Sequence, residues 1–132
     1  MGWAIGASVG VALGRRNTPV VCFTGDGCFL MSGQEITVAV EERLPVIFVV
    51  LNDHAYGMIR HAHRLAGTEP LDFAIPPVDF CMMAKAVGAH AHAIRGPDDF
   101  ERIDYQALCS RDGPTLLDVS IDPEEAPPLG MV

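Results

Sequence analysis

Basic residues are scarce in this chain. Its 132 residues include 9 lysines and arginines against 17 aspartates and glutamates, which gives a net charge of −8 at pH 7. Proteins that bind nucleic acid need a basic face, so nucleic acid is excluded as a partner. Because 49% of the residues are hydrophobic and no repeat or low-complexity tract occurs, one globular domain is expected over residues 1–132.

The sequence also lacks a paired-cysteine motif and a membrane-spanning run. None of its four cysteines belongs to a C-x-x-C motif, which indicates free thiols in a reducing cytoplasm. The apolar run over residues 1–13 is too short to span a bilayer. Arg15 and Arg16 follow this run, whereas a secretory signal carries its positive charges before the run. We therefore expect a cytoplasmic protein without a membrane partner.

Two short apolar runs each lead into a carboxylate. Residues 20–23 precede Gly25-Asp26-Gly27, and residues 46–51 precede Asn52-Asp53. Continuous apolar runs of this length suit strands that are buried on both faces of a parallel sheet. Open α/β sheets bind ligands at the carboxyl ends of their strands, and divalent metals prefer oxygen ligands. The two carboxylates therefore predict a seat for a divalent metal and a phosphate group.

Helix and strand patterns alternate along the chain, which predicts an α/β fold. The expected architecture is a three-layer, doubly wound parallel sheet with helices on both faces. Residues 67–77 are expected to form a loop, and residues 122–132 a Pro-rich, acidic surface tail. The expected helices cover residues 2–13, 32–42, 56–65, 79–88 and a segment from 97 onward, and the expected strands cover residues 20–24, 46–51, 89–94 and 115–121.

Local signals predict where several helices begin and which side chains they bury. Ser32 and Glu35 form a capping-box pattern, Asp79 is a candidate N-cap, and Pro97 suits a first helical position. Helical periodicity places the following side chains in the core: Phe80, Met83, Ala84, Val87, Phe100, Ile103 and Ala107.

The order of these motifs resembles the thiamine-diphosphate motif, in which a G-D-G triplet and a helix precede a strand that ends in an Asn pair. The resemblance is to the C-terminal cofactor-binding domain of acetolactate-synthase-like enzymes, a group that includes 2-oxo-acid decarboxylases. It covers nearly the whole chain, which would then be truncated on the N-terminal side of the domain. The matching segments are 25–31, 34–35, 44–46, 51–60 and 113–119.

The resemblance implies thiamine diphosphate and Mg²⁺ as cofactors. The metal ligands would be the carboxylates of Asp26 and Asp53 and the backbone carbonyl of Ala55. Asp53 stands where the family usually has the second Asn of the pair, and its charge should attract the metal more strongly and the diphosphate less. The implied cofactor-binding residues are Met1, Gly25, Gly27, Cys28, Tyr56, Gly57 and Met58.

The resemblance assigns no catalytic side chain to this chain. The glutamate that hydrogen-bonds the aminopyrimidine ring belongs to a separate domain, usually on a partner subunit, so the isolated chain should be inactive. Met1 aligns with the bulky residue that bends the cofactor. The full enzyme would act on a small 2-oxo acid by decarboxylation or carboligation, and it would be a homo-oligomer.

Two other functions fit the sequence. One is a non-catalytic assembly module that keeps the fold without turnover. The other is an unrelated doubly wound phosphate-binding domain, in which Asp26 and Asp53 need not share an ion. His54 would lie beside the metal site, where contact with substrate and simple exposure are both open. The pairs His61/His63 and His90/His92 have no third ligand nearby in sequence, so a metal role is disfavoured.

Overall fold

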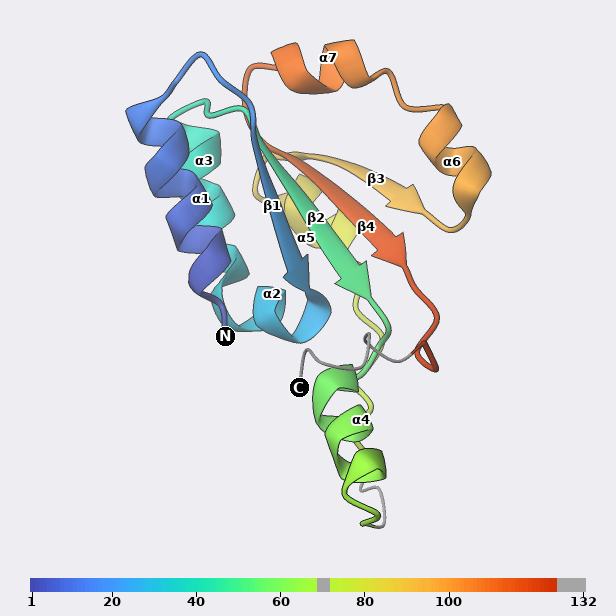
Figure 1. The fold of residues 1–132 in the computed structure, drawn as a ribbon. Coiled ribbons are helices and arrows are strands. Elements are labelled where there is room, and N and C mark those ends of the chain that lie inside the picture. Colours follow the sequence, from blue (N-terminus) through green and yellow to red (C-terminus); the bar gives the residue numbers. More distant parts are fainter. Residues whose placement is uncertain (69–71, 126–132) are drawn as a thin grey trace.

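The fold is built on a parallel four-stranded sheet (Figure 1), seen in a computed structural model that describes residues 1–68 and 72–125. The strand order is β1-β2-β4-β3, and all pairings are parallel. This arrangement confirms the predicted doubly wound α/β fold. The strands are β1 (Val20–Gly25), β2 (Val46–Asn52), β3 (His90–Ile94) and β4 (Thr115–Ser120).

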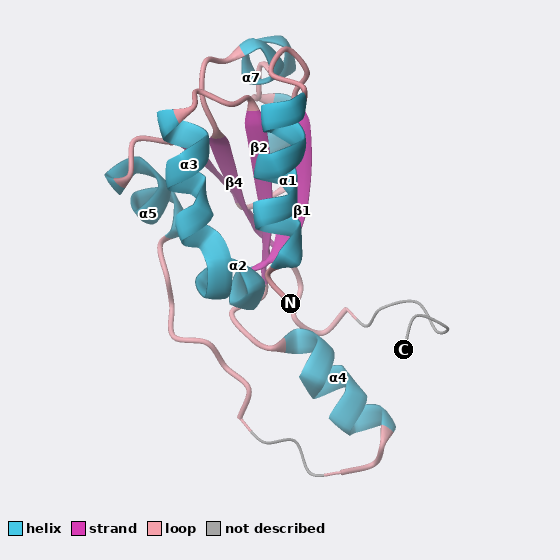
Figure 2. Cartoon of the chain, turned by 90° about the vertical axis from the view of Figure 1, so that its left-hand side faces the viewer, coloured by secondary structure: helices cyan, strands magenta, loops and turns pink. Residues whose placement is uncertain are grey.

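Helices lie on both faces of the sheet (Figures 1 and 2). Helices α1, α3 and α5 cover one face, and α7 contributes to the opposite face. Helix α4 projects beyond the carboxyl ends of the strands. The helical bounds are α1 (Trp3–Gly14), α2 (Asp26–Ser32), the 3₁₀ turn η1 (Gly33–Glu35), α3 (Ile36–Glu41), α4 (Gly57–Leu65), α5 (Phe80–Ala86), α6 (Pro97–Glu101) and α7 (Tyr105–Ser110).

Two apolar clusters result from the alternation of side chains along the buried strands. In β2, Phe48 points into the larger cluster, under α1, α3 and α5, and Val49 points into the smaller one, under α7. The ring of Phe29 packs edge-on against Phe48 and Phe80, with centroid distances of 6.4 and 5.6 Å. These contacts hold α2 and α5 against the sheet at the end where β1 and β2 stop.

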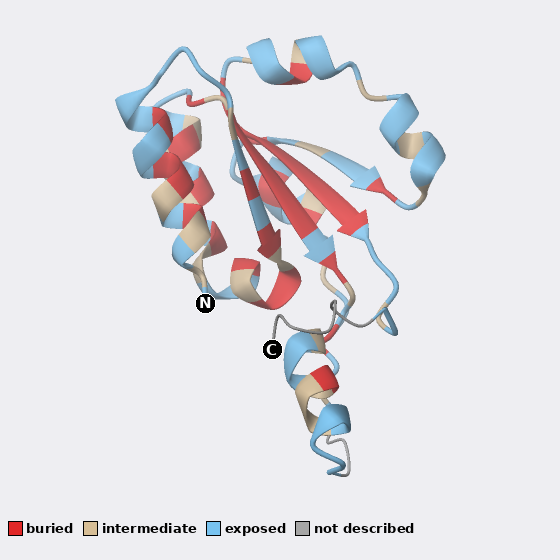
Figure 3. Cartoon of the chain, in the orientation of Figure 1, coloured by how far each residue is buried: buried red, intermediate tan, exposed pale blue. Residues whose placement is uncertain are grey.

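One part of the sheet surface is apolar and open. On β1, Val21 is 51% exposed and Phe23 is 66% exposed, so this edge strand is buried on only one side (Figure 3). The glycines at positions 6, 10 and 14 of α1 also face open space. Both surfaces are open to solvent in the described part of the chain.

Several local predictions are confirmed and several are wrong. The Asp79 carboxylate caps α5 by accepting the Met82 N–H at 2.7 Å. The Ser32–Glu35 capping box is wrong, because the chain is already helical from Asp26 and the Ser32 side chain makes no capping bond. The segment after Pro97 forms two helices instead of one, since Asp104 caps α7 by accepting the Ala107 N–H at 2.9 Å.

The burial predictions for α5 and α6 are partly wrong. Phe80 and Ala84 are buried, but Met83 and Val87 are 42% and 38% exposed. Phe100 is also 38% exposed, and the helix that carries it, α6, packs on the edge strand β3. Of the expected surface tail, residues 122–125 are mostly exposed, and 126–132 lie outside the described residues, as do 69–71 of the predicted loop. Among the helices described, none has the length and hydropathy needed to cross a membrane.

Candidate functional site

Asp26 lies where β1 passes directly into α2. Gly25 has extended backbone angles and serves as the N-cap, so Asp26 is the first residue of the helix. Its side chain is only 3% exposed. One carboxylate oxygen, Oδ1, accepts the Gly27 N–H at 2.6 Å. The other, Oδ2, is buried and has no hydrogen-bond partner among the described residues.

The electrostatic environment of Asp26 opposes its charge. Burial is the largest cause that raises the pKa of this carboxyl above its usual range, and the nearby negative charge of Asp53 raises it further. The hydrogen bond from the Gly27 N–H acts in the opposite direction without cancelling the shift. The site therefore holds an uncompensated negative charge, which a cation would stabilise.

Asp53 lies at the same edge of the sheet as Asp26. Strands β1 and β2 are neighbours, and the pairing of Gly25 with Leu51 brings their carboxyl ends level with each other. The chain then turns through His54, whose φ of 55° is unusual for a residue with a side chain. The sheet thus brings the two sequence-predicted carboxylates together at adjacent strand ends.

Two side-chain hydrogen bonds stabilise the turn after β2. Oδ1 of Asn52 accepts the His54 N–H at 3.2 Å, and Oδ1 of Asp53 accepts the Ala55 N–H at 3.1 Å. Asn and Asp favour such turns because their short side chains mimic a backbone acceptor. We call residues 52–55 the ligand turn.

Ala55 forms an isolated antiparallel bridge with Ala74. The bridging hydrogen bonds come from the residues on either side, from Tyr56 N–H to the Phe73 carbonyl at 2.9 Å and from Ile75 N–H to the His54 carbonyl at 2.7 Å. The carbonyl of Ala55 accepts no backbone hydrogen bond within residues 1–68 and 72–125. It remains available to a ligand beside the two carboxylates.

The first turn of α4 packs closely on this edge. Tyr56 is the N-cap residue, and its ring covers Gly27, where an added Cβ would come within 2.8 Å of Cε1. An added Cβ on Gly57 would overlap Oδ2 of Asp53. Met58 follows and is 57% exposed. Both glycines are therefore needed for close packing, apart from any role toward a ligand.

Three further predictions from the sequence concern Met1, Cys28 and the pair His90/His92. Met1 is 78% exposed and precedes α1, and the N-terminus lies beside α2 (Figure 1). Cys28 is in the first turn of α2 and is half-buried. His90 and His92 are exposed on β3. In the described part of the chain, no three His, Cys, Asp or Glu side chains gather into a metal cluster.

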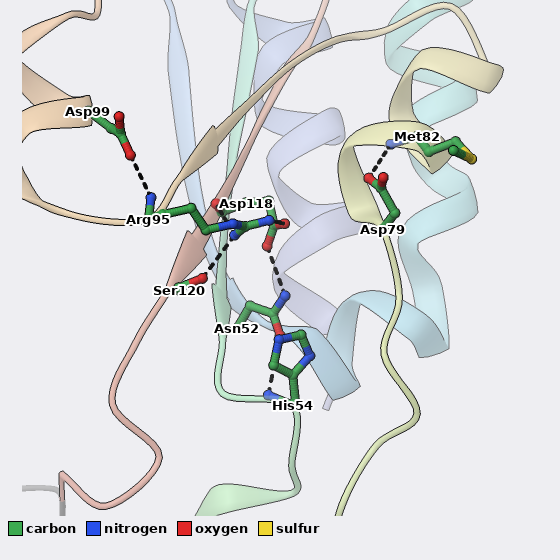
Figure 4. Close-up of polar contacts among 8 residues, drawn as sticks. All are labelled: Asn52, His54, Asp79, Met82, Arg95, Asp99, Asp118 and Ser120. Atoms are coloured by element: carbon green, nitrogen blue, oxygen red, sulfur yellow. Dashed lines mark hydrogen bonds and ion pairs between the residues drawn. The ribbon is translucent and has the colours of Figure 1, made fainter.

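A second group of polar residues, not singled out from the sequence, lies directly behind the ligand turn (Figure 4). Asp118 is 1% exposed in β4; its Oδ1 accepts from Asn52 Nδ2 at 2.9 Å, and its Oδ2 is 2.7 Å from Nη2 of Arg95. The hydrogen bond to Asp118 raises the pKa of Arg95 above its usual range. The available signal was a carboxylate in the middle of the apolar run 115–119, where a buried charge requires a partner.

Comparison with known protein families agrees with the fold. The family model described as "Thiamine pyrophosphate enzyme, C-terminal TPP binding domain" matches residues 1–119. Thiamine pyrophosphate and thiamine diphosphate are the same compound.

Similar proteins are much longer than this chain. The large subunit of acetolactate synthase isozyme 2 of Escherichia coli is 36% identical over 92% of this chain, which spans 22% of that protein. A putative acetolactate synthase large subunit of Mycobacterium tuberculosis is 37% identical over 99% of the chain and 24% of its own length. A solved benzoylformate decarboxylase from Polynucleobacter necessarius superposes with a TM-score of 0.87 and 33% identity, covering 96% of this chain and 24% of that one.

Proposed function

The chain belongs to the family of C-terminal TPP-binding domains of thiamine pyrophosphate enzymes, and on this premise we propose that it supplies the metal and diphosphate site of an enzyme that acts on 2-oxo acids. The single observation that carries the proposal is the orphaned carboxylate oxygen of Asp26. It is buried, lies beside a second carboxylate and lacks a partner among the residues described. Such a charge destabilises the apoprotein, and a bound Mg²⁺ compensates it.

The proposed metal ligands are the carboxylates of Asp26 and Asp53 and the carbonyl of Ala55. All are hard oxygen donors, which is the chemistry that Mg²⁺ prefers. The residues present fit the ion, since Asp26 Oδ2 lacks a hydrogen bond and the Ala55 carbonyl accepts no backbone bond within the described segments. Such a site needs only two carboxylates from the protein when diphosphate oxygens complete the coordination shell.

The proposed diphosphate seat is formed by the first turns of α2 and α4. The amides of Cys28, Gly57 and Met58 belong to helix N-termini, which favour anions, and Gly27 lies in the same first turn of α2, where its N–H donates to Asp26. Gly25 and Tyr56 are the N-cap residues of the two helices. The negative charge of Asp53 repels the diphosphate, and a metal held by Asp53 would offset that repulsion. Met1 is proposed to support the centre of the cofactor.

When bound, thiamine diphosphate supplies the carbanion chemistry that 2-oxo-acid decarboxylation and carboligation require. This chain's own residues bind and orient the cofactor: Asp26, Asp53 and Ala55 hold the metal, and the helix N-termini hold the diphosphate. Tyr56 covers Gly27 and limits access of water to the base of the site. We assign no proton transfer to a side chain of this chain, and we propose that the isolated chain is inactive.

The substrate is proposed to be a small 2-oxo acid. Acetolactate synthases and a benzoylformate decarboxylase are among the similar proteins. One solved relative, from Rhodococcus jostii, is a thiamine diphosphate-dependent 4-hydroxybenzoylformate decarboxylase, 26% identical with a TM-score of 0.85. These names span carboligation and decarboxylation. The family match argues against an unrelated phosphate-binding domain.

We also propose that the protein works as a homo-oligomer. The outer side of β1, with Val21 and Phe23, and the exposed Trp3 of α1 are apolar surfaces of the kind that interfaces cover. A non-catalytic assembly module would use the same surfaces, and cofactor turnover is the property that distinguishes the enzyme from it.

Calorimetric titration of the full natural chain tests the proposed function. Thiamine diphosphate should bind in the presence of Mg²⁺ and not in the presence of EDTA, and Asp26→Ala should abolish binding. The wild-type protein should then release carbon dioxide from pyruvate or benzoylformate, whereas the isolated 132-residue chain should release none. Cofactor binding without turnover of any 2-oxo acid would favour the assembly module. Unchanged binding by Asp26→Ala would overturn the site assignment.

A further inference from the structure

A series of hydrogen bonds connects Arg95, at the surface, to the ligand turn (Figure 4). The guanidinium of Arg95 donates to Oδ2 of Asp118 at 2.7 Å. Oδ1 of Asp118 accepts from Nδ2 of Asn52 at 2.9 Å, and Oδ1 of Asn52 accepts the His54 N–H at 3.2 Å. Asn52 and Asp118 are each 1% exposed, so the hydrogen bond between their side chains is buried.

The hydrogen bond to Asp118 determines which way the Asn52 side chain points. A carboxylate only accepts hydrogen bonds, whereas an amide side chain has one accepting and one donating end. The NH₂ group of Asn52 must therefore face Asp118, and its oxygen is turned toward the His54 N–H. With the amide reversed, two oxygens would face each other at Asp118 and two donors would meet at His54.

Arg95 is the cationic partner of the buried Asp118 carboxylate. Its Nη1 also donates to the Asp118 carbonyl at 3.3 Å and to Ser120 Oγ at 2.9 Å, so the guanidinium is held by several contacts. The Arg95 side chain is 54% exposed, whereas that of Asp118 is 1% exposed. A buried carboxylate that lost this partner would be left uncompensated, which is costly in the interior.

The orientation of Asn52 matters because His54 has a strained backbone. Its φ of 55° lies in the left-handed region, which a side-chain-bearing residue adopts only when neighbouring contacts require it. The Asn52 oxygen supplies one such contact, and the residues on either side of His54 are Asp53 and Ala55. A reversed or unpaired Asn52 would relax this turn and move both of its proposed metal ligands.

We propose that Asp118 and Arg95 are positioning residues for the metal site: they orient the Asn52 carboxamide and, through it, the turn that presents Asp53 and Ala55 to Mg²⁺. This inference rests on the proposed function of the ligand turn. Neither residue touches the metal. Removing a residue that orients metal ligands through hydrogen bonds commonly weakens metal binding by about 10–100-fold.

The test compares two arginine variants in the full natural chain. Arg95→Gln removes the ion pair to Asp118 and keeps the Arg95 backbone N–H that donates to Asp99 at 2.8 Å. The control, Arg16→Gln, removes an ion pair to Glu42 of 2.6 Å, and its side chain is similarly exposed, at 55%. Mg²⁺ dissociation constants are measured by calorimetry at saturating thiamine diphosphate, and melting temperatures are measured in EDTA.

The expected result is a Kd for Mg²⁺ raised about tenfold by Arg95→Gln and changed less than about twofold by Arg16→Gln. Arg95→Lys, which restores the charge, should recover affinity to within about threefold of wild type. Asp118→Asn should weaken Mg²⁺ binding more than Arg95→Gln does; if it fails to fold, the Arg95 series decides. If Arg95 only stabilised the fold, Arg95→Gln would lower the melting temperature in EDTA and leave the Kd of the folded protein for Mg²⁺ unchanged.

Two negative results are distinguishable. If the wild-type protein binds Mg²⁺ and thiamine diphosphate, Asp26→Ala does not, and Arg95→Gln binds like Arg16→Gln, then the positioning role is wrong and the proposed function stands. If the wild-type protein does not bind the pair at all, both are overturned.

Discussion

The carboxylate of Asp53 lies against the backbone of Gly57, so that a Cβ on Gly57 would overlap Oδ2 of Asp53. The Oδ1 atom of the same carboxylate accepts the Ala55 N–H at 3.1 Å. The side chain is therefore confined between the ligand turn and the first turn of α4. This packing makes the position of a proposed metal ligand depend on the absence of a side chain four residues later.

Gly57→Ala should displace Asp53 and raise the Kd for Mg²⁺ about tenfold, since the added methyl group occupies the place of Oδ2. The measurement is calorimetric titration with Mg²⁺ at saturating thiamine diphosphate. Gly96→Ala is the control, because Gly96 has extended backbone and, apart from its two chain neighbours, no atom of the described residues lies within 4 Å of the place that its Cβ would take. Equal Mg²⁺ affinity in the two variants would show that Asp53 is not a ligand or that it adjusts freely.

Asp26→Asn should raise the free energy of unfolding of the metal-free protein by about 1 kcal/mol near neutral pH, because it removes a buried charge with an unpaired oxygen. It should also abolish Mg²⁺ binding. Urea denaturation in EDTA measures the first effect, and calorimetry the second. A metal-free variant less stable than wild type would contradict the prediction.

The same carboxyl predicts a pH dependence. Burial raises the pKa of Asp26 in the folded state above its unfolded value of about 3.9. The folded state then holds the proton more tightly, so this contribution to stability is complete below the unfolded pKa and is lost as the pH rises through the folded pKa. In EDTA, the stability advantage of Asp26→Asn over wild type should grow with pH across this window and then level off. An advantage that shrinks with rising pH would mean that the shift has the opposite sign.

Gly27→Ala should lower the melting temperature and weaken cofactor binding, because its Cβ would come within 2.8 Å of the Tyr56 ring. Tyr56→Ala makes room for that methyl group. The cost of Gly27→Ala should therefore be smaller in the Tyr56→Ala background, with a coupling of about 0.5–3 kcal/mol in a double-mutant cycle. Strictly additive effects would show that the two residues do not contact each other in solution.

Sedimentation should show self-association, and Trp3→Glu should weaken it. Trp3 is 81% exposed on the glycine-bearing helix α1, and a charge there opposes burial in an interface. Met82→Glu, at a residue 67% exposed on α5, is the matched control and should leave association unchanged. A wild-type protein that remains monomeric at high concentration would count against the proposed oligomer.

The sequence alone determined the alternating elements, the parallel sheet and the family resemblance. These depend on local patterns: the buried strands are short apolar runs, and each carboxylate of the proposed metal site directly follows one. Because parallel neighbours end at the same edge, placing Asp26 near Asp53 required only the correct pairing of β1 with β2. Helix boundaries were less predictable. The capping pattern at Ser32 does not start a helix, because the chain is already helical from Asp26.

Only the tertiary structure decided which residues support the ligand turn, namely Asp118 and Arg95. Asn52 and Asp118 are 66 residues apart in the chain, and Arg95 and Asp118 are 23 apart. No local pattern predicts which polar group will face a buried carboxylate, because that depends on the order of the strands and on which residues oppose each other across them. The register that pairs Val50 with Asp118 and Asn52 with Ser120 places the amide beside the carboxylate, and the neighbouring strand β3 brings Arg95 to it.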